Sequence, residues 1–261
     1  MRVAITGAAR GIGFATAKAL RDKGAAVVIG DVDEEAVRSA AAELGVTGLR
    51  LDVADRASFQ NFLAGSGDYD VLINNAGIMP IGPVLEESEA DARRCFDINV
   101  HGVMTGTKLA LEKFVPEGRG HIVNVASVAG VLPTPGLALY NGSKAAVVAF
   151  TEAVRLEVRR HGVHVGAVLP SFTNTELVAG TRSPRGQRNC EPEEIAAAVL
   201  SLLARPRPQV VVPARLSPQI RAMPLVPQRV KDLLNRRLGL DTLFLEFDPG
   251  ARKSYDERIR S

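Results

Sequence analysis

The amino-acid sequence predicts an α/β protein built on a doubly wound parallel sheet. Two observations carry this prediction. Short apolar runs of strand length alternate with longer amphipathic stretches from the N-terminus to about residue 212. The first apolar run leads directly into a glycine-rich turn, and the second ends in an acidic residue. This order of elements is typical of a βαβ unit that binds a dinucleotide.

The N-terminal unit places three glycines, Gly7, Gly11 and Gly13, directly after the first strand. Gly7 permits a sharp turn, Gly11 lets the backbone approach a pyrophosphate, and Gly13 lets the following helix pack closely on the sheet. The N–H groups at the start of that helix would face the phosphates. The second strand ends at Asp31, where an acid can bind a ribose 2′-hydroxyl.

The same alternation continues along the chain and predicts a Rossmann-type sheet of seven parallel strands with helices on both faces. We expect residues 1–215 to form the dinucleotide-binding and catalytic domain. Strands are expected at residues 2–6, 25–30, 48–53, 69–74, 121–125, 164–169 and 209–212. Helices are expected at about 11–22, 34–44, 56–64, 88–114, from 140 to 160, and from 191 onward.

A tyrosine and a lysine one helical turn apart, Tyr140 and Lys144, form a candidate acid–base pair. At positions i and i+4 of a helix, their side chains lie on one face. A phenol has a pKa of about 10, and a nearby ammonium would lower that pKa. The hydroxyl of Ser127, at a strand end, could hold the oxygen of an alcohol or ketone beside the tyrosine. These residues indicate carbonyl–alcohol interconversion.

With these motifs the sequence resembles the short-chain dehydrogenases/reductases of the ordinary single-domain type. The matching motifs lie at residues 6–13, 52–53, 74–77, 99, 127 and 140–144, in the family's order. The resemblance implies a nicotinamide cofactor along the carboxyl ends of the strands and a catalytic tetrad of Asn99, Ser127, Tyr140 and Lys144. It also implies cofactor contacts from Gly7, Arg10, Gly11, Ile12, Gly13, Asp31, Asp52, Val53, Asn75, Ala76, Gly77, Tyr140, Lys144, Pro170, Thr173 and Thr175.

Each catalytic candidate also has a structural interpretation. Ser127 could cap a turn, and Asn99 could be a buried structural residue or mark a kink in its helix. Tyr140 could be a core aromatic residue, and Lys144 could belong to a solvated face. A protein that keeps the fold and binds nucleotide without turnover is therefore an alternative to an enzyme.

The acid at position 31 predicts NAD as the cofactor, with NADP as the alternative. Its carboxylate would repel a 2′-phosphate and accept a hydrogen bond from a free 2′-hydroxyl. Arg10 argues for NADP, since a basic residue in this loop often accompanies NADP in the family. A second uncertainty follows the sixth strand, where Ser171 replaces the family's glycine after Pro170. Serine tolerates fewer backbone conformations than glycine, so the sequence does not decide whether the backbone here follows the family's conformation.

Composition indicates which partners and which cellular compartment to expect. A net charge of +3 over 261 residues indicates no nucleic-acid partner. Cys95 and Cys190 show no metal-ligand spacing, so we expect no metal site. The chain opens directly on its first strand and has no apolar run of transmembrane length, which predicts a cytoplasmic protein without a signal peptide.

The C-terminal extension, residues 216–261, departs from the family, whose members usually end soon after the seventh strand. Residues 205–261 hold 12 Lys and Arg against 6 Asp and Glu. We expect a helix that packs on the same domain or on a neighbouring subunit. A basic amphipathic helix resting on an anionic membrane is the alternative. The apolar stripe of this helix comprises Val226, Val230, Leu233, Leu234 and Leu238.

Three segments should line the substrate pocket: residues 80–90, 128–139 and 171–190. An apolar pocket favours a lipophilic secondary or allylic alcohol, or the matching ketone. The alternatives are an acidic substrate held by Arg182, Arg185 and Arg188, or a lipid, retinoid or steroid substrate at a membrane surface. The apolar lining is expected from Val128, Val131, Leu132, Leu137, Leu139 and Phe172.

The resemblance also implies self-association. Family members usually pair through the helices that carry Asn99 and Tyr140, so we expect a homodimer or homotetramer. The apolar contact is expected from Leu109, Val147, Phe150, Val154 and Val158.

Overall fold

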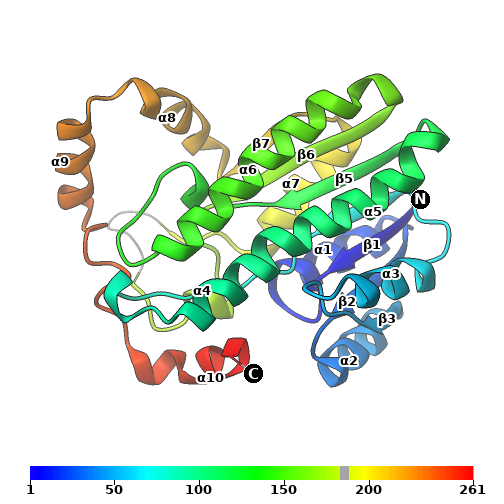
Figure 1. Cartoon of the computed structure of the whole chain (residues 1–261), viewed down its shortest axis with the longest axis horizontal. Coiled ribbons are helices and arrows are strands. Elements are labelled where there is room, and N and C mark those ends of the chain that lie inside the picture. The colour runs from blue at the N-terminus through cyan, green and yellow to red at the C-terminus, as the bar shows by residue number, and fades with distance from the viewer. Residues whose placement is uncertain (183–187, 261) are drawn as a thin grey trace.

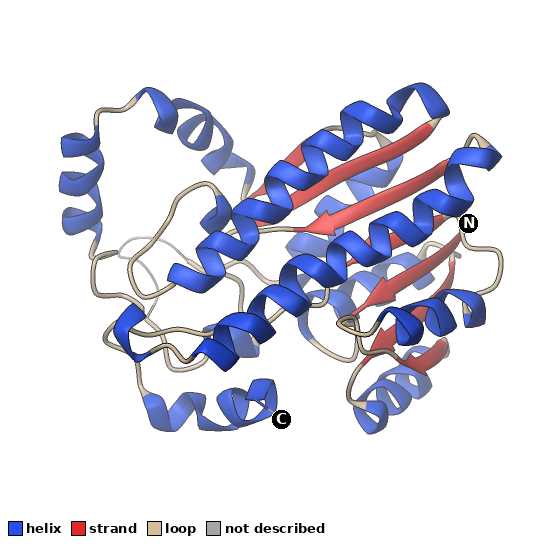
Figure 2. Cartoon of the chain, viewed as in Figure 1, coloured by secondary structure: helices blue, strands red, loops and turns tan. Residues whose placement is uncertain are grey.

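The computed structural model describes residues 1–182 and 188–260, and its centre is a seven-stranded, all-parallel sheet with helices on both faces (Figures 1 and 2). The strand order is β3-β2-β1-β4-β5-β6-β7. The chain reverses direction across the sheet between β1 and β4, so the loops after these two strands diverge and open a crevice at the carboxyl edge. The strands are β1 (Arg2–Thr6), β2 (Ala26–Asp31), β3 (Thr47–Arg50), β4 (Val71–Asn74), β5 (Gly120–Val125), β6 (Val163–Pro170) and β7 (Gln209–Val212).

The two faces of the sheet are covered by different sets of helices. Alternate residues of β1 point to opposite faces: Val3 and Ile5 join one apolar core, and Ala4 joins the other. The first core holds α1 (Gly11–Asp22), α2 (Glu34–Leu44) and α7 (Pro192–Ala204). The second core holds α3 (Arg56–Gly65), α5 (Gly102–Glu117) and α6 (Ala138–Val158).

A buried polar network ties the second layer of helices to the sheet. The side chain of Asn74 on β4 donates to Asn124 on β5 at 2.9 Å and to Thr107 on α5 at 3.2 Å. Asn124 donates in turn to Thr151 on α6 at 2.9 Å. Buried amides are costly unless they are paired, so this network fixes the helix that carries Tyr140 against the strands.

The expected single helix over residues 88–114 is wrong in one respect. It is divided into α4 (Glu89–Phe96), a π-helical turn (Asp97–His101) and α5. Asn99, expected to be either a buried structural residue or the site of a kink, is buried in this π turn, where the winding of the helix changes. Strand β3 is also shorter than expected, so Asp52 and Val53 lie in the turn beyond it.

The C-terminal extension forms α8 (Ser217–Ala222), α9 (Gln228–Leu238) and α10 (Pro249–Arg260). The described part of the α9 stripe is open, since Val230 and Leu233 are 44% and 50% exposed. The side chains of Leu234 and Leu238 lie outside the described part. Helix α10 instead packs on the body below α4 (Figure 1), with Tyr255 buried. None of the helices in the described ranges has the length and apolarity needed to span a bilayer.

The apolar residues expected to form a subunit contact are mostly unavailable for one. Leu109, Val147, Val154 and Val158 are buried within the subunit's own cores. These side chains of α5 and α6 pack toward the sheet.

Candidate active site

One cavity of about 1400 Å³ lies along the carboxyl edge of the sheet. Nearly every residue that the sequence predicted to be catalytic or cofactor-binding lines this cavity. Gly13 and Asn99 are the two exceptions, and both lie directly behind the lining. The predicted residues that line the cavity are Gly7, Arg10, Gly11, Ile12, Asp31, Asp52, Val53, Asn75, Ala76, Gly77, Ser127, Tyr140, Lys144, Pro170, Thr173 and Thr175.

The glycine-rich turn is shaped so that only glycine fits. Gly7 and Gly11 have φ angles of +62° and +56°, which side chains disfavour. A Cβ on Gly7 would lie 2.6 Å from the Ala76 Cα, and a Cβ on Gly13 would lie 2.5 Å from the Gly7 carbonyl oxygen. The backbone of this turn is therefore packed against the loop after β4, and its other side faces the cavity.

The N-terminus of α1 differs from those of α2 and α3. Asp33 and Asp55 accept hydrogen bonds from the first turns of α2 and α3, whereas no described side chain caps α1. Free N–H groups and the helix dipole make an uncapped N-terminus attractive to an anion. Because this end opens into the cavity, it can hold a phosphate.

Asp31, the last residue of β2, lies beside the glycine-rich turn. Its carboxylate accepts hydrogen bonds from the Ala9 N–H at 3.1 Å and the Asp33 N–H at 3.3 Å. Arg10 pairs with Asp33 at 2.8 Å, and this hydrogen bond holds the pKa of Asp33 below its usual value. This pairing of Asp33 with Arg10 was not predicted from the sequence. A basic residue in the glycine-rich turn and an acid just after β2 could have suggested it.

Asn75 has a structural task. Its side-chain amide donates to the carbonyl oxygens of Thr6 and Gly7 at 2.9 and 2.8 Å. The Thr6 hydroxyl accepts from the backbone N–H groups of Asn75 and Ala76, both at 3.0 Å. The asparagine therefore ties the loop after β4 to the glycine-rich turn.

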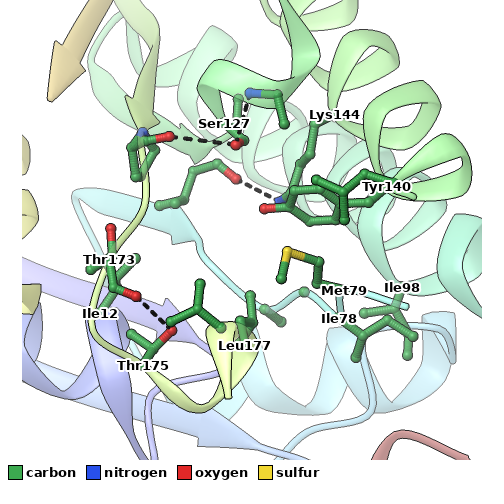
Figure 3. Close-up of a pocket in the computed structure, with 18 of the residues that line it drawn as sticks. Ile12, Ile78, Met79, Ile98, Ser127, Tyr140, Lys144, Thr173, Thr175 and Leu177 are labelled. Carbon is green, nitrogen blue, oxygen red and sulfur yellow. Dashed lines mark hydrogen bonds between the residues drawn. The ribbon is translucent and has the colours of Figure 1, made fainter. Parts of the chain in front are cut away.

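Ser127, Tyr140 and Lys144 face one space at the deep end of the cavity (Figure 3). Ser127 follows β5, and its hydroxyl accepts from the Ala129 N–H at 3.1 Å. The Lys144 ammonium donates to the Val125 carbonyl at 3.0 Å and lies 5.7 Å from the centre of the Tyr140 ring. All three side chains are buried, so the interpretation of Lys144 as a solvated surface residue is wrong.

Burial governs the protonation of the pair. It raises the pKa of Tyr140 to about 12, and a hydrogen bond with the Ser127 side chain only partly opposes the shift. Burial also lowers the pKa of Lys144 to about 8. The direction for the tyrosine is opposite to the one expected from the lysine charge, because the loss of hydration on burial is the largest effect on its pKa.

Asn99 is fully buried and joins this group to the loop after β4. Its side-chain oxygen accepts from the Ile78 N–H at 2.8 Å, and its amide donates to the Ile78 carbonyl at 2.9 Å. The amide also donates to Ser143 at 3.0 Å. A Cβ on Gly77 would lie 3.2 Å from the Asn99 oxygen and 3.3 Å from the Lys144 nitrogen, so the loop passes directly against the tetrad.

The wall beside Tyr140 is apolar, as expected, but only part of the expected set forms it. Val128, Val131, Leu132, Leu137 and Phe172 line the cavity. Leu139 does not, and from residues 80–90 only Ala90 does. The missing positions are supplied by Met79 and, from the C-terminal extension, by Leu240, Phe244 and Tyr255.

The loop arginines stand apart from the cavity. Arg182 is exposed, and Arg188 pairs with Glu194 at 2.8 Å; neither lines the cavity. Arg185 lies outside the described residues. The two described arginines therefore give no support to an acidic substrate held by this loop.

Ser171 fits the backbone without strain. No described residue other than glycine has a positive φ, so the position does not need the freedom of glycine. The Ser171 N–H donates to the Val212 carbonyl at 2.8 Å, which continues the pairing of β6 with β7. The threonines beyond it, Thr173 and Thr175, both line the cavity.

Residues of the C-terminal extension also line the cavity, which was not predicted from the sequence. Phe244 stacks on Phe172 with ring centres 5.6 Å apart and planes at 10°. Arg252, Tyr255 and Ile259 are buried on one face of α10. Their spacing of three and four residues is a helical period and could have identified this face.

Three features line one cavity: the glycine-rich turn with the uncapped start of α1, Asp31 at the end of β2, and the buried Tyr140–Lys144 pair. Together they define a dinucleotide-dependent oxidoreductase. Comparison with known proteins agrees. The family model described as short chain dehydrogenase matches residues 1–186. The chain belongs to this family and is an NAD(P)-dependent oxidoreductase that acts on CH–OH groups.

Individual relatives give the same picture. A 2,5-dichloro-2,5-cyclohexadiene-1,4-diol dehydrogenase of Sphingobium indicum is 38% identical over 67% of this chain and 74% of its own. A cis-4-hydroxycyclohexanecarboxylate dehydrogenase of Sinomonas cyclohexanicum is 40% identical over 77% and 88%. A solved 3-ketoacyl-(acyl-carrier-protein) reductase of Brucella melitensis, complexed with NADH, is 27% identical over 82% and 97%, with a TM-score of 0.74.

Proposed function

We propose that the protein oxidises a lipophilic cyclic alcohol, secondary or allylic, with NAD, or reduces the matching ketone. The observation that carries the proposal is the meeting of three features in one cavity. The glycine-rich turn, the Ser127–Tyr140–Lys144 group and an apolar wall all line it.

The described residues fit a nicotinamide dinucleotide. The uncapped start of α1 and the glycine turn offer N–H groups to a pyrophosphate, and Asp31 offers a carboxylate to a ribose. Thr173 and Thr175, which also line the cavity, offer hydroxyl groups to the carboxamide and phosphates. When bound, the cofactor supplies the hydride acceptor or donor.

The protein's own residues handle the proton. Ser127 and Tyr140 bind the substrate oxygen, because both hydroxyl groups face the same buried space. In oxidation the Tyr140 phenolate removes the hydroxyl proton, and in reduction the phenol returns it. Lys144, in its charged form, stabilises the phenolate. Asn99 holds the loop at Ile78 and, through Ser143, the helix that carries the tyrosine.

NAD is proposed over NADP because of the charges at the end of β2. Asp31 and Asp33 lie side by side there, and a 2′-phosphate would meet both carboxylates. Arg10, which could have offered a compensating charge, is already paired with Asp33.

The substrate class rests on the wall and on the relatives. The apolar cluster around Tyr140 includes Met79, Leu137, Leu243 and Phe244. Such a surface favours a compact hydrocarbon ring over a polyol. The two relatives described above are named for substrates that carry hydroxyl groups on six-membered carbon rings.

We propose that residues 1–215 form the catalytic unit, that residues 216–261 complete it, and that the enzyme works in the cytoplasm as a homo-oligomer. A lipid-surface dehydrogenase is the second candidate, and the open stripe of α9 beside exposed arginines favours it. Co-sedimentation with anionic vesicles tests that candidate.

A substrate screen tests the main proposal. Purified protein is assayed for nicotinamide reduction with cyclohexanol, 2-cyclohexen-1-ol, cyclopentanol and sorbitol, each with NAD and with NADP. We expect the cyclic alcohols to exceed sorbitol by at least about tenfold in kcat/KM with NAD, as loss of apolar contact costs 1.4 kcal/mol or more. A preference for sorbitol would contradict the proposed substrate class. A lack of turnover with all four would favour a nucleotide-binding protein without activity.

A further inference from the structure

Helix α10 lies across two loops that frame the candidate active site. One is the loop after β4, which includes Met79, and the other is the turn after β6, residues 176–180. Both loops line the cavity, at Met79 and at Leu177 and Val178. The helix lies beyond the residues that match the family model, 1–186.

The centre of the contact is Arg252, whose side chain is fully buried. Its guanidinium donates to the Leu177 carbonyl at 2.6 Å and to the Ala179 carbonyl at 3.4 Å. It donates as well to the carbonyl of Met79. Asp256, one turn later, accepts from its Nε at 2.9 Å. A single side chain therefore joins the two loops and has a carboxylate to balance its charge.

Tyr255 completes the hold on Met79. The Met79 N–H donates to the Tyr255 hydroxyl at 2.8 Å, so both backbone polar groups of Met79 are bound by α10. The preceding residue, Ile78, has both of its backbone groups bound by Asn99. Ile78 and Met79, which are consecutive, thus link Asn99 to α10. All four of their backbone polar groups are hydrogen-bonded, two to Asn99 and two to α10.

Contacts at both ends of α10 hold the helix in place, and the first comes from Asp248, directly before it. The Asp248 N–H donates to the Gly180 carbonyl at 2.8 Å. Arg258 pairs with Glu176, and Arg260 lies 3.3 Å from Asp91 on α4. The helix therefore spans from the turn after β6 to α4.

We propose that Arg252 and Tyr255 are positioning residues for the dehydrogenase reaction. They hold the loop at residues 78–79 against Asn99 and place Met79 beside Tyr140, where the substrate's ring is bound. The inference rests on the proposed function for its kinetic part only, because amide hydrogen exchange measures how firmly the two loops are held without any turnover.

The test compares two variants with one control. Tyr255→Phe removes a single hydroxyl and leaves the ring in place, and Arg252→Met removes the guanidinium but keeps an apolar stem. Arg260→Gln removes a charged contact of the same helix at the protein surface and serves as the control. Each protein is examined by amide hydrogen exchange over residues 77–81 and 176–181, and by steady-state kinetics with a cyclic alcohol.

We expect exchange over residues 77–81 to rise at least about tenfold in Tyr255→Phe, and over both segments in Arg252→Met. We expect kcat/KM to fall about tenfold in Tyr255→Phe, mainly through a higher KM for the alcohol, with the Kd of NAD within twofold of wild type. A helix that served only global stability would instead speed exchange throughout the chain and leave this KM unchanged.

The outcomes separate the two proposals. Wild-type turnover together with unchanged exchange and KM in Tyr255→Phe would overturn the positioning role while the proposed function stands. No turnover in the wild type, with the expected local change in exchange, would overturn the proposed function and leave the structural link intact. If Arg252→Met fails to fold, Tyr255→Phe decides the matter alone.

Discussion

At the scale of single residues, burial decides the chemistry of the site. Tyr140 and Lys144 are 7% and 4% exposed, and the loss of hydration disfavours the charged form of each. The resting pair is therefore a phenol beside a lysine that loses its proton near pH 8. The phenol suits ketone reduction, whereas alcohol oxidation needs the phenolate, which forms more readily as the pH rises.

The pH dependence of oxidation follows from these two pKa values. In the proposed mechanism the active form for oxidation carries a phenolate and an ammonium. Below pH 8 the lysine is charged and the phenolate fraction grows about tenfold per pH unit, so kcat/KM should grow with it. Above pH 8 the loss of the ammonium cancels further gain of phenolate, and the profile should level. In Lys144→Met we expect a lower rate without the break near pH 8. A flat wild-type profile between pH 6 and about 8 would contradict this assignment.

Cofactor choice is also set by single residues. In Asp31→Ser, one carboxylate is removed and the backbone N–H groups of Ala9 and Asp33 are freed for an anion. We expect the NADP to NAD ratio of kcat/KM to rise by about 10- to 100-fold, because about 1.4 to 2.7 kcal/mol of repulsion is lost. Asp55→Ser, which keeps a side-chain cap on α3, is the control. An unchanged ratio would show that Asp31 does not face the ribose.

At the scale of elements, local patterns predicted most of what the structure contains. The strand, glycine turn and helix at the N-terminus could be assigned because each uses short-range chemistry, namely apolar alternation and the freedom of glycine. The break at Asn99 could be suspected but not located, because a π turn is stabilised by the distant contact with Ile78. The shortened β3 illustrates that strand ends depend on pairing partners and not on the strand's own residues.

The glycine-rich turn offers a test of element geometry. Gly7→Ala adds a Cβ at φ +62° and 2.6 Å from the Ala76 Cα. We expect a loss of about 2–4 kcal/mol in the free energy of unfolding, from backbone strain and overpacking together. Gly24→Ala provides the matched control, because Gly24 has φ +80° and no neighbour within 4 Å. Its cost should be about 1 kcal/mol. Equal Tm changes in the two variants would mean that the contact with the loop after β4 is not tight.

At the scale of the whole molecule, the substrate wall is assembled from parts that are far apart in the chain. Phe172 meets Phe244, and Met79 meets Tyr255 and Arg252. No short-range pattern links such pairs. The sequence could therefore single out the Tyr140–Lys144 pair and the glycine turn, which line the cavity, but not the C-terminal residues that pack beside them. The same limit explains the incorrect choice of residues 80–89 for the lining.

Self-association is a prediction at this scale. We expect a homodimer or homotetramer, since Leu156 on α6 and Val84 and Leu85 beside α4 leave apolar side chains exposed at 47%, 63% and 96%. Light scattering at micromolar concentration measures the mass directly, and Leu156→Glu should shift it toward one chain. A wild-type mass of one chain would refute the prediction.

The central claim is that Tyr140 transfers the proton in a nicotinamide-dependent reaction, and one comparison tests it most directly. Wild type and Tyr140→Phe are titrated with NAD by calorimetry and then assayed with a cyclic alcohol. The phenyl ring preserves packing in the buried site, so the Kd of NAD should stay within about twofold, while kcat should fall by about 10²- to 10⁴-fold. A Tyr140→Phe enzyme that binds NAD and keeps most of its kcat would contradict the account.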